Sequence, residues 1–413
     1  MTDSTSLGGQ QVPAAARAGF EPVPGGHVVP ARLSGGAPSA VRARKKHTGA
    51  ILGSLGAVVA AAAIIVVQLI ANVGYDDAET AYADSAATAA TLRSDLSAEL
   101  DALRSTTESA TLVIQSDSGL LLDAGSRDAL AAAAAESETT ASEADELVSV
   151  TLPGAGEKPF WFWQLFGAAQ QLDGYRADAE EHAEDLQDGT DGVAAEASEL
   201  TDAGVAALTA AAGAAAPFEA AHINARNLDV IALRDTAEEA AATTALDAYA
   251  VDVFSSLNAA ATQVIASEQA ELAEKAGPLQ GARLEVEAFA RSLAPGVLLD
   301  FDWAPLVNGF GYDGGMGGYA TWWYGDPGYA TIQLSNSVAE QWPAARSQAL
   351  VAHEVGHAIS VRCADMYDSS TQDSIENWAT AWAISMGFTD DANGVWAYGY
   401  PPQSYIDAAA ACR

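Results

Sequence analysis

Basic residues are scarce in this sequence. Lys and Arg together number 19 against 55 Asp and Glu, so the formal net charge at neutral pH is -36. Proteins that bind nucleic acid contact its phosphates through a basic surface, and this composition therefore excludes nucleic acid as a partner. Solubility is the simplest explanation of the acidic charge. At 413 residues the chain is too long for one compact core, so we expect at least two regions.

Cysteine is nearly absent, because only Cys363 and Cys412 occur. Inside a cell the two would be buried thiols, whereas outside a cell they would form one disulfide. That bond would close a loop of roughly 50 residues and stabilise the fold by about 3–4 kcal/mol in the chain-entropy model. The compartment of the C-terminal part of the chain therefore decides between the two states.

Charge of either sign is missing from residues 49–71, GAILGSLGAVVAAAAIIVVQLIA. A helix of about 23 residues measures roughly 35 Å, which is enough to cross a bilayer. Its main polar residue is Gln68. A buried core helix would rarely run this long without a charged face, and the preceding tail is too long for a cleaved signal peptide. We therefore predict a single transmembrane helix within residues 48–74.

The flanking residues orient this helix in the membrane. Before it lie Arg42, Arg44, Lys45 and Lys46, and after it lie Asp76, Asp77 and Glu79. The positive-inside rule places the N-terminus in the cytoplasm and the chain from about residue 75 onward outside the cell. Residues 1–47 are rich in Gly, Pro, Ala and Ser and predict a disordered cytoplasmic tail. In this topology the two cysteines are expected to form a disulfide.

Residues 75–294, called the helical region below, contain few aromatic residues and much Ala, Glu, Asp, Thr and Leu. Apolar residues recur at three- and four-residue steps in 92–114, and a helical pattern resumes over 124–150 after an interruption at Ser118-Gly119. The two segments predict a helical hairpin. After the breaker TLPGAGEKP (151–159) another helical run is predicted to about Leu186, and the helical pattern over 189–213 is weaker because it contains several glycines. A long helix is then predicted from Pro217 to Ala276.

We find no fixed-period repeat in the helical region, and we interpret it as an alanine-rich extracellular stalk, bundle or coiled coil with solvated acidic faces. One cluster, WFWQLF at 161–166, stands out because it contains Trp161 and Trp163. It could pack in the core of a helix hairpin, which we favour, or form an exposed patch at the membrane interface or at a partner.

The composition changes after Pro295-Gly296 to aromatics, glycines and turns, which indicates a small α+β domain over residues 295–413, called the C-terminal domain below. The segment 309–318, GFGYDGGMGG, is expected to be a flexible loop. YATWWYG and YATIQLSN, separated by a turn at 325–328, predict two strands. A helix is expected to start near Trp342-Pro343.

That last helix contains ALVAHEVGHAIS (349–360), with two of the six histidines of the chain four residues apart. In a helix this spacing puts His353 and His357 on one face, within reach of one metal ion. Glu354 lies at the adjoining edge, where its carboxylate can reach water at the metal rather than the metal itself. A chance occurrence of this combination is improbable in a chain so poor in histidine.

HEVGH (353–357) resembles the HExxH helix of the zincins, which are zinc metallopeptidases, and the resemblance covers the C-terminal domain only. It implies two histidine ligands, one further protein ligand and a water at the zinc. In the metzincin branch a histidine would stand at Cys363 and a glycine at Ser360, so that branch is excluded. Cys363 as a thiolate ligand is conceivable, but a bond to Cys412 would remove it.

The gluzincin branch takes its third ligand from a second helix. Here Glu376 lies 19 residues after His357 in IENWATAWAISMG (375–387), with the small residues Ala379 and Ala383 on the same face. Its rivals are Asp365, Asp368 and Asp373, in a segment that we interpret as a surface connection. Gluzincins often carry an aspartate four residues after the ligand glutamate, where this chain has Thr380. Asn377 and Asp373 are possible substitutes for that aspartate.

The resemblance also implies a mechanism, in which Glu354 deprotonates the water bound to zinc and passes the proton to the leaving amine. A tyrosine is a suitable donor to the negative intermediate, and the candidates are Tyr312, Tyr319, Tyr324, Tyr329, Tyr398, Tyr400 and Tyr405. An edge strand aligns the peptide substrate in zincins, and residues 330–336 are its expected counterpart here.

The whole sequence therefore predicts a mainly α, single-pass protein of the cell membrane, whose zincin-like domain cleaves peptide or protein substrates outside the cell. Its site would consist of Zn2+, the ligands His353, His357 and Glu376, and the catalytic Glu354. A catalytically inactive zinc-binding scaffold of the cell envelope is the alternative, against which the retained Glu354 argues. A purely structural spacer would describe the helical region and could coexist with either function.

Overall fold

A computed structural model of the chain describes residues 48–413, so the tail predicted for residues 1–47 lies outside the described part. The chain divides between Val66 and Val67 into two compact units. The described part is mainly helical and contains a small mixed sheet, as the sequence predicts.

The predicted membrane segment is helical and belongs to α1 (Thr48–Ser116). Large apolar side chains of this helix, among them Val58, Ile64 and Ile65, are exposed. Two helical stretches, Ala57–Ser116 and Phe162–Ala221, are long and apolar enough to cross a membrane. They differ in that 6% of the most apolar window of the first is buried, against 28% of the second. Burial in a protein core therefore explains the apolar residues of the first stretch less well than those of the second.

Buried residues recur every seven positions both in α1 and in α3 (Phe162–Ala221), where the two helices pack together. In α1 every seventh residue from Tyr75 is buried: Tyr75, Tyr82, Ala89, Leu96, Leu103 and Ala110. In α3 the same holds from Leu165: Leu165, Leu172, Ala179, Leu186, Val193, Leu200 and Ala207. This is the spacing of a coiled-coil seam. The prediction of no fixed-period repeat is therefore wrong, because residues of very different size share the repeated positions.

The two helices run in the same direction. Ser85 bonds to Glu180 at 3.3 Å, and the rings of Tyr82 and Tyr175 lie 5.8 Å apart. Further down, Gln68 contacts Phe162, so the register offset stays at 93 to 95 residues. A constant offset of this kind defines a parallel pair.

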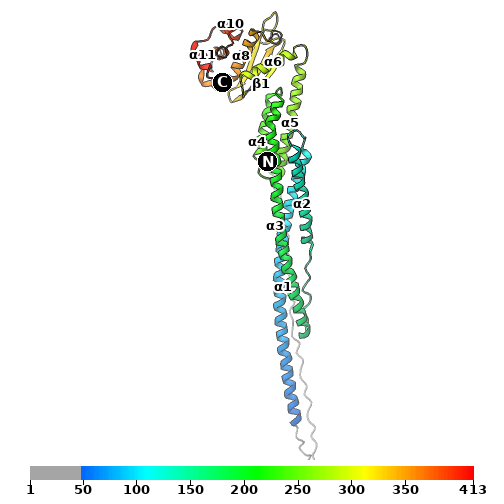
Figure 1. The fold of residues 1–413 in the computed structure, drawn as a ribbon. Coiled ribbons are helices and arrows are strands. Elements are labelled where there is room, and N and C mark those ends of the chain that lie inside the picture. Colours follow the sequence, from blue (N-terminus) through cyan, green and yellow to red (C-terminus); the bar gives the residue numbers. More distant parts are fainter. Residues whose placement is uncertain (1–47) are drawn as a thin grey trace, which may run out of the picture. The chain divides into compact units, whose positions relative to one another are not determined.

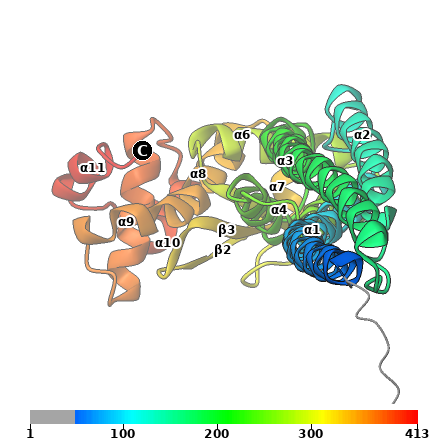
Figure 2. The same cartoon turned by 90° about the horizontal axis from the view of Figure 1, so that it is seen from below.

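The predicted hairpin is confirmed: α2 (Ala124–Ser149) follows a turn in which Gly119 has a φ of 71°. Asp123 caps α2 by accepting from the backbone N–H groups of Gly125 and Ser126. The axes of α1, α2 and α3 are seen nearly end-on in Figure 2, with α2 beside α3. The predicted breaker, residues 151–159, is free of helix.

The glycines of 189–213 do not interrupt α3. A Cβ on Gly189 would lie 2.8 Å from a methyl of Leu147, and one on Gly204 would lie 2.5 Å from a methyl of Leu246. These glycines make room for side chains of neighbouring segments, so the helix tolerates their lower propensity.

The single helix predicted from Pro217 to Ala276 is wrong. Pro217 lies inside the last turns of α3, and two helices follow, α4 (Asn227–Ala241) and α5 (Ala248–Glu274). At the first break, the backbone N–H of Arg226 donates to the Ser267 hydroxyl at 2.9 Å. At the second, the Asp247 side chain caps α5 by accepting from the Ala250 N–H. Polar side chains thus replace the backbone bonds that a continuous helix would have made.

The C-terminal domain contains the sheet. The sheet follows α6 (Gln280–Leu293) in the sequence. Its strands are β1 (Leu298–Ala304), β2 (Gly318–Trp323) and β3 (Asp326–Ser335), and β3 lies between β1 and β2. The two predicted strands are present as β2 and β3, while β1 was not predicted. The sheet packs against α6 and α8 (Figure 1).

The expectation that residues 330–336 form an edge strand is wrong. They belong mostly to β3, which is the central strand, parallel to β1 and antiparallel to β2. Because β3 is paired on both sides, its backbone groups are not available to a substrate. β2 forms an edge instead, and it is the strand that packs on α8.

The helices after the sheet are α7 (Asn336–Glu340), α8 (Ala345–Ser360), α9 (Gln372–Ser385), α10 (Val395–Tyr398) and α11 (Gln403–Ala409), with 3-10 turns η1 (Val361–Met366) and η2 (Asp391–Asn393). A disulfide joins Cys363 to Cys412 across a sequence separation of 49 residues, as predicted. Cys363 is thereby removed as a metal ligand.

Candidate metal centre

The metal motif lies on α8, which is enclosed by β2, α9 and η2. Every residue from Ala349 to Ser360 is buried, including His353, Glu354 and His357. A Cβ on Gly356 would lie 2.9 Å from the backbone oxygen of Ala379 on α9. The glycine therefore allows α8 and α9 to approach closely.

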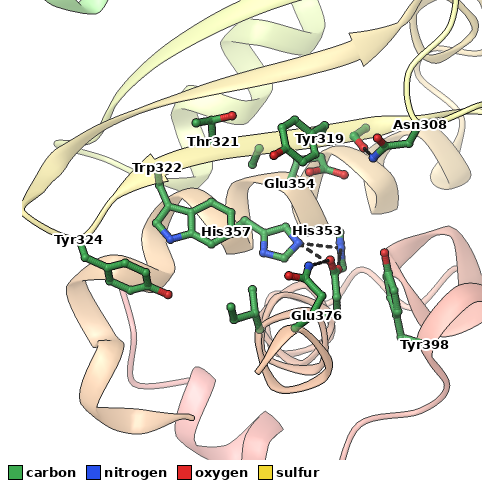
Figure 3. Close-up of a pocket in the computed structure, with 14 residues that line it drawn as sticks. Asn308, Tyr319, Thr321, Trp322, Tyr324, His353, Glu354, His357, Glu376 and Tyr398 are labelled. Atoms are coloured by element: carbon green, nitrogen blue, oxygen red, sulfur yellow. Dashed lines mark hydrogen bonds and ion pairs between the residues drawn. The ribbon is translucent and has the colours of Figure 1, made fainter. Parts of the chain in front are cut away.

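Three side chains from these two helices converge on one point (Figure 3). Oε2 of Glu376 lies 3.2 Å from Nε2 of His353 and 3.2 Å from Nε2 of His357. The two Nε2 atoms are 3.1 Å apart. The structure thus brings together all three predicted ligands. The rival residues Asp365, Asp368 and Asp373 are exposed and lie outside this group.

The triangle of donor atoms has the size that a zinc site requires. Ligand atoms about 2.0–2.1 Å from a tetrahedral zinc lie about 3.3–3.4 Å from one another. The observed separations of 3.1 to 3.2 Å are close to this value. Two imidazoles and one carboxylate are also a donor set of catalytic zinc sites, so the residues fit a divalent metal such as zinc.

Hydrogen bonding around His353 supports the same conclusion. Thr380 donates its hydroxyl proton to the backbone oxygen of Glu376 at 2.8 Å, so it can only accept from Nδ1 of His353, 3.3 Å away. With the ring proton on Nδ1, Nε2 presents a lone pair to the Glu376 carboxylate. Nε2 and the carboxylate are then two acceptors at 3.2 Å, and they repel unless a positive charge lies between them, either a second ring proton or a metal ion.

Thr380 therefore occupies the position at which the resemblance expects an aspartate. Neither of the proposed substitutes reaches the histidines, since Asn377 donates to the backbone of Asp373 at the exposed start of α9. His357 is positioned by stacking on Trp322 of β2, with ring centroids 5.2 Å apart. Its Nδ1 is buried without a hydrogen-bond partner in the described part of the chain.

Gln372 holds the third ligand in place, because its Nε2 donates to Oε1 of Glu376 at 2.7 Å and leaves Oε2 facing the histidines. Sequence reasoning missed both Gln372 and Trp322. Gln372 precedes Glu376 by one helical turn and could have been found by that spacing. Trp322 could not, because the pairing of its strand with α8 is a tertiary contact.

Burial and charge act in opposite directions on the ligands. Burial acts to raise the pKa of Glu376, but hydrogen bonds from both histidines and their charges outweigh it, and this pKa falls well below its usual range. Burial lowers the pKa of His357. For His353 burial also lowers the pKa, but the bond to Glu376 and the nearby carboxylates raise it further than burial lowers it. The Glu376 carboxylate is thus ionised and could coordinate a cation.

Glu354 lies beside the donor triangle, not within it. Its carboxylate packs against the backbone at the start of β2, where a Cβ on Gly318 would lie 2.3 Å from Oε1. Burial raises the pKa of Glu354 to about 7, with His353 opposing the shift and Glu376 adding to it. A carboxyl group with such a pKa can accept and return a proton near neutral pH.

Two cavities meet at these residues. One of about 310 Å³ is lined by β2 residues, by the ligand triad and by Tyr319, Tyr324 and Tyr398. Another of about 430 Å³ shares His353, Glu354 and Tyr398 and extends to Phe310, Met316 and Trp396. The other candidate tyrosines, Tyr312, Tyr329, Tyr400 and Tyr405, line neither cavity.

Tyr398 is the candidate tyrosine whose ring stacks on one of the predicted ligands. Its ring stacks on His353 with centroids 6.0 Å apart, on the side away from His357 (Figure 3). Burial and the charges of Glu376 and Glu354 raise the pKa of Tyr398 to about 12. Its hydroxyl therefore stays protonated and can donate a hydrogen bond.

Comparison with known proteins adds no relative: no family model, curated protein or solved structure matches this chain.

Proposed function

We propose that the C-terminal domain is a zinc-dependent peptidase of the gluzincin-like zincin type, with His353, His357 and Glu376 as ligands. The fit of three donor atoms to a tetrahedral ion supports a metal, and the choice of two imidazoles and a carboxylate supports zinc. Zinc in such a site supplies a Lewis acid that activates water and polarises a carbonyl group.

The observation that carries the proposal is Glu354. A metal that only stabilised the fold would not need a second buried acidic group beside its ligand Glu376, with a pKa raised to about 7. In the proposed reaction this carboxylate takes the proton of the attacking water. It then transfers that proton to the amine that leaves, and so returns to its starting state.

Tyr398 is the donor that we assign to the negative charge on the former carbonyl oxygen. It lines both cavities and keeps its proton, and it lies next to His353. A hydrogen bond that strengthens as this charge develops stabilises the transition state more than the substrate.

A peptide would align on β2. This strand forms an edge of the sheet beside the ligand triad, so its free backbone groups can pair with an extended chain. The two cavities that meet at Glu354 would take side chains on either side of the cleaved bond. An extended peptide or protein segment is therefore the substrate class that we assign.

The chain is proposed to cross the cell membrane once, through the N-terminal part of α1, with the N-terminus in the cytoplasm. The basic residues before the apolar run and the acidic residues after it support this orientation. The Cys363–Cys412 disulfide supports an oxidising compartment for the C-terminal domain. α3 is assigned to the helical region because its seven-residue repeat is buried against α1.

The test is hydrolysis of a broad peptide library by the full chain in detergent, with and without a chelator. We expect cleavage that stops on chelation and returns with zinc. Glu354→Gln should lower the rate by about 10²–10⁴-fold and still bind one zinc ion. The exposed Glu340→Gln on α7 is the matched control and should cleave normally. If the wild type binds zinc and cleaves no better than Glu354→Gln, the chain is a zinc-binding scaffold instead.

A further inference from the structure

An exposed aromatic cluster precedes and begins α3. Phe160, Trp161, Trp163 and Phe166 are 76, 49, 56 and 49% exposed, while Leu165 between them is fully buried against α1. The indoles of Trp161 and Trp163 are stacked, with centroids 5.0 Å apart and planes 7° from parallel. The expectation of core packing is therefore wrong for both tryptophans. A stacked, outward-facing pair of this size needs an apolar or interfacial partner.

The cluster lies beside the end of the uncharged run of α1. Nε2 of Gln68 donates to the backbone oxygen of Phe160 at 2.8 Å, and its Oε1 accepts from the Phe162 N–H at 2.9 Å. The main polar side chain of the apolar run is thereby satisfied, and so are two backbone groups of the cluster. An unsatisfied polar group at membrane depth is costly, and this pairing avoids that cost for both segments.

The charged parts of the two helices begin at the same level. In α1 no charge occurs from Gly49 to Tyr75, and Asp76 follows. After Lys158 no charge occurs until Asp173. The separation of these two aspartates is 97 residues, against a register offset of 93 to 95, so their levels differ by about one helical turn at most.

The Lys158 side chain reaches the point at which the charged residues of α1 begin. It precedes the aromatic cluster, yet its ammonium group pairs with Asp76 and lies 5.3 Å from the centre of the Tyr75 ring. The side chain thus extends away from the aromatic cluster toward the first charged turn of α1. Lysines at a membrane surface extend in this way, with the stem in the apolar layer and the charge in water.

We propose that Phe160, Trp161, Trp163 and Phe166 insert into the interfacial layer of the outer leaflet, beside the point where α1 leaves the membrane. Tryptophan favours this layer because its ring is apolar and its N–H can bond to water or headgroups. The parallel helices α1 and α3 would then both be held at the bilayer, α1 by its membrane segment and α3 by this cluster. The inference concerns membrane contact and does not rest on the proposed peptidase activity.

The test uses the full chain in phosphatidylcholine vesicles and measures tryptophan fluorescence with brominated lipids. Bromine near the headgroup should quench more than bromine near the bilayer centre. The double variant Trp161→Phe, Trp163→Phe keeps aromatic rings in place, and it should lose about half or more of the lipid-dependent quenching. The other seven tryptophans all lie at or beyond Trp303, in the C-terminal domain. Trp396→Phe, which removes a 71% exposed indole there, is the control and should leave the quenching unchanged.

Acrylamide, applied in water, gives the opposite readout. It should quench the fluorescence of Trp396 readily. It should quench the fluorescence of Trp161 and Trp163, which is the signal lost in the double variant, poorly. Equal lipid quenching of the wild type and the double variant would overturn the proposal, and so would full access of acrylamide to Trp161 and Trp163. If the double variant instead abolishes a cross-linked dimer without changing lipid quenching, the cluster is a contact between two copies and the membrane assignment is wrong.

Discussion

The helical region and the C-terminal domain bury different kinds of side chain. The core between α1 and α3 consists of leucine, valine, alanine and tyrosine at a seven-residue spacing, with few buried polar groups. The C-terminal domain buries His353, Glu354, His357, Glu376 and Thr380 close together. Repetition distributes stability over many similar small contacts. A buried polar cluster concentrates it on a few groups that must all be satisfied, and this is where chemistry is possible.

Loss of a ligand should give the largest difference between the two regions. Glu376→Ala is expected to remove zinc binding, because two histidines without a carboxylate hold the ion too weakly. Metal content measured by mass spectrometry should fall from one zinc per chain to none. Helix content by circular dichroism should change little, since most helix lies in the helical region.

Asp373→Ala provides the matched control for this change. Asp373 lies on the same helix, in the exposed first turn of α9, and it was a rival candidate for the third ligand. This variant should retain one zinc ion. Zinc retention in Glu376→Ala would contradict the ligand assignment.

Removal of the disulfide should destabilise the C-terminal domain selectively. Replacing Cys363 and Cys412 by serine reopens the loop between them and should lower the free energy of unfolding by about 3–4 kcal/mol. Calorimetry of the full chain in detergent should show a lower transition temperature for this domain alone. An equal shift in the unfolding of the helical region would show that the two regions unfold together.

The pH dependence of stability tests a contact between the helical region and the C-terminal domain. Asp300 on β1 accepts from the backbone N–H of Asn227 on α4 at 2.8 Å, and burial raises its pKa from 3.8 to about 6. Between these values the unfolded chain loses the proton first, so stability should fall as pH rises from about 4 to 6, by at most about 3 kcal/mol. Above about pH 6 this contribution is constant.

Asp300→Asn keeps the acceptor oxygen and removes the titration. Its unfolding free energy, measured by denaturant titration at several pH values, should fall less than that of the wild type over this interval, because the contribution of Asp300 is removed. Asp302→Asn on the same strand is the comparison. If Asp300→Asn leaves the pH profile unchanged, the carboxyl group of Asp300 titrates normally.

Two glycines of α3 should respond to alanine with opposite signs, and this is the smallest effect. In Gly204→Ala the new methyl would overlap Leu246, which should cost about 1–3 kcal/mol. In Gly213→Ala the methyl meets nothing within 4 Å, so the better helix propensity should stabilise by about 0.5–1 kcal/mol. Thermal unfolding by circular dichroism measures both. Equal signs would mean that Leu246 moves aside freely.

Local patterns were sufficient for much of the architecture. The uncharged run, the hairpin, the breaker at 151–159 and strands β2 and β3 follow from residues adjacent in sequence. The prediction failed at Pro217–Ala276, where the side chains of Ser267 and Asp247 accept from backbone N–H groups and so replace helical backbone bonds. It also failed for the seven-residue repeat, because alanine and leucine both occur at its positions. At Leu96 the space comes from Gly189 of α3, where a Cβ would lie 3.4 Å from a Leu96 methyl.

The sequence by itself determined the composition of the candidate site. Helical spacing places His353 and His357 on one face, and the position of Glu376 in a second helix makes it a candidate ligand, since these are consequences of a 3.6-residue turn. Only the tertiary structure decided which strand forms the edge beside the site, that Thr380 and Gln372 orient the ligands, and that Trp161 and Trp163 face outward. Those outcomes depend on distances between segments far apart in the chain, which the periodicity within one segment does not specify.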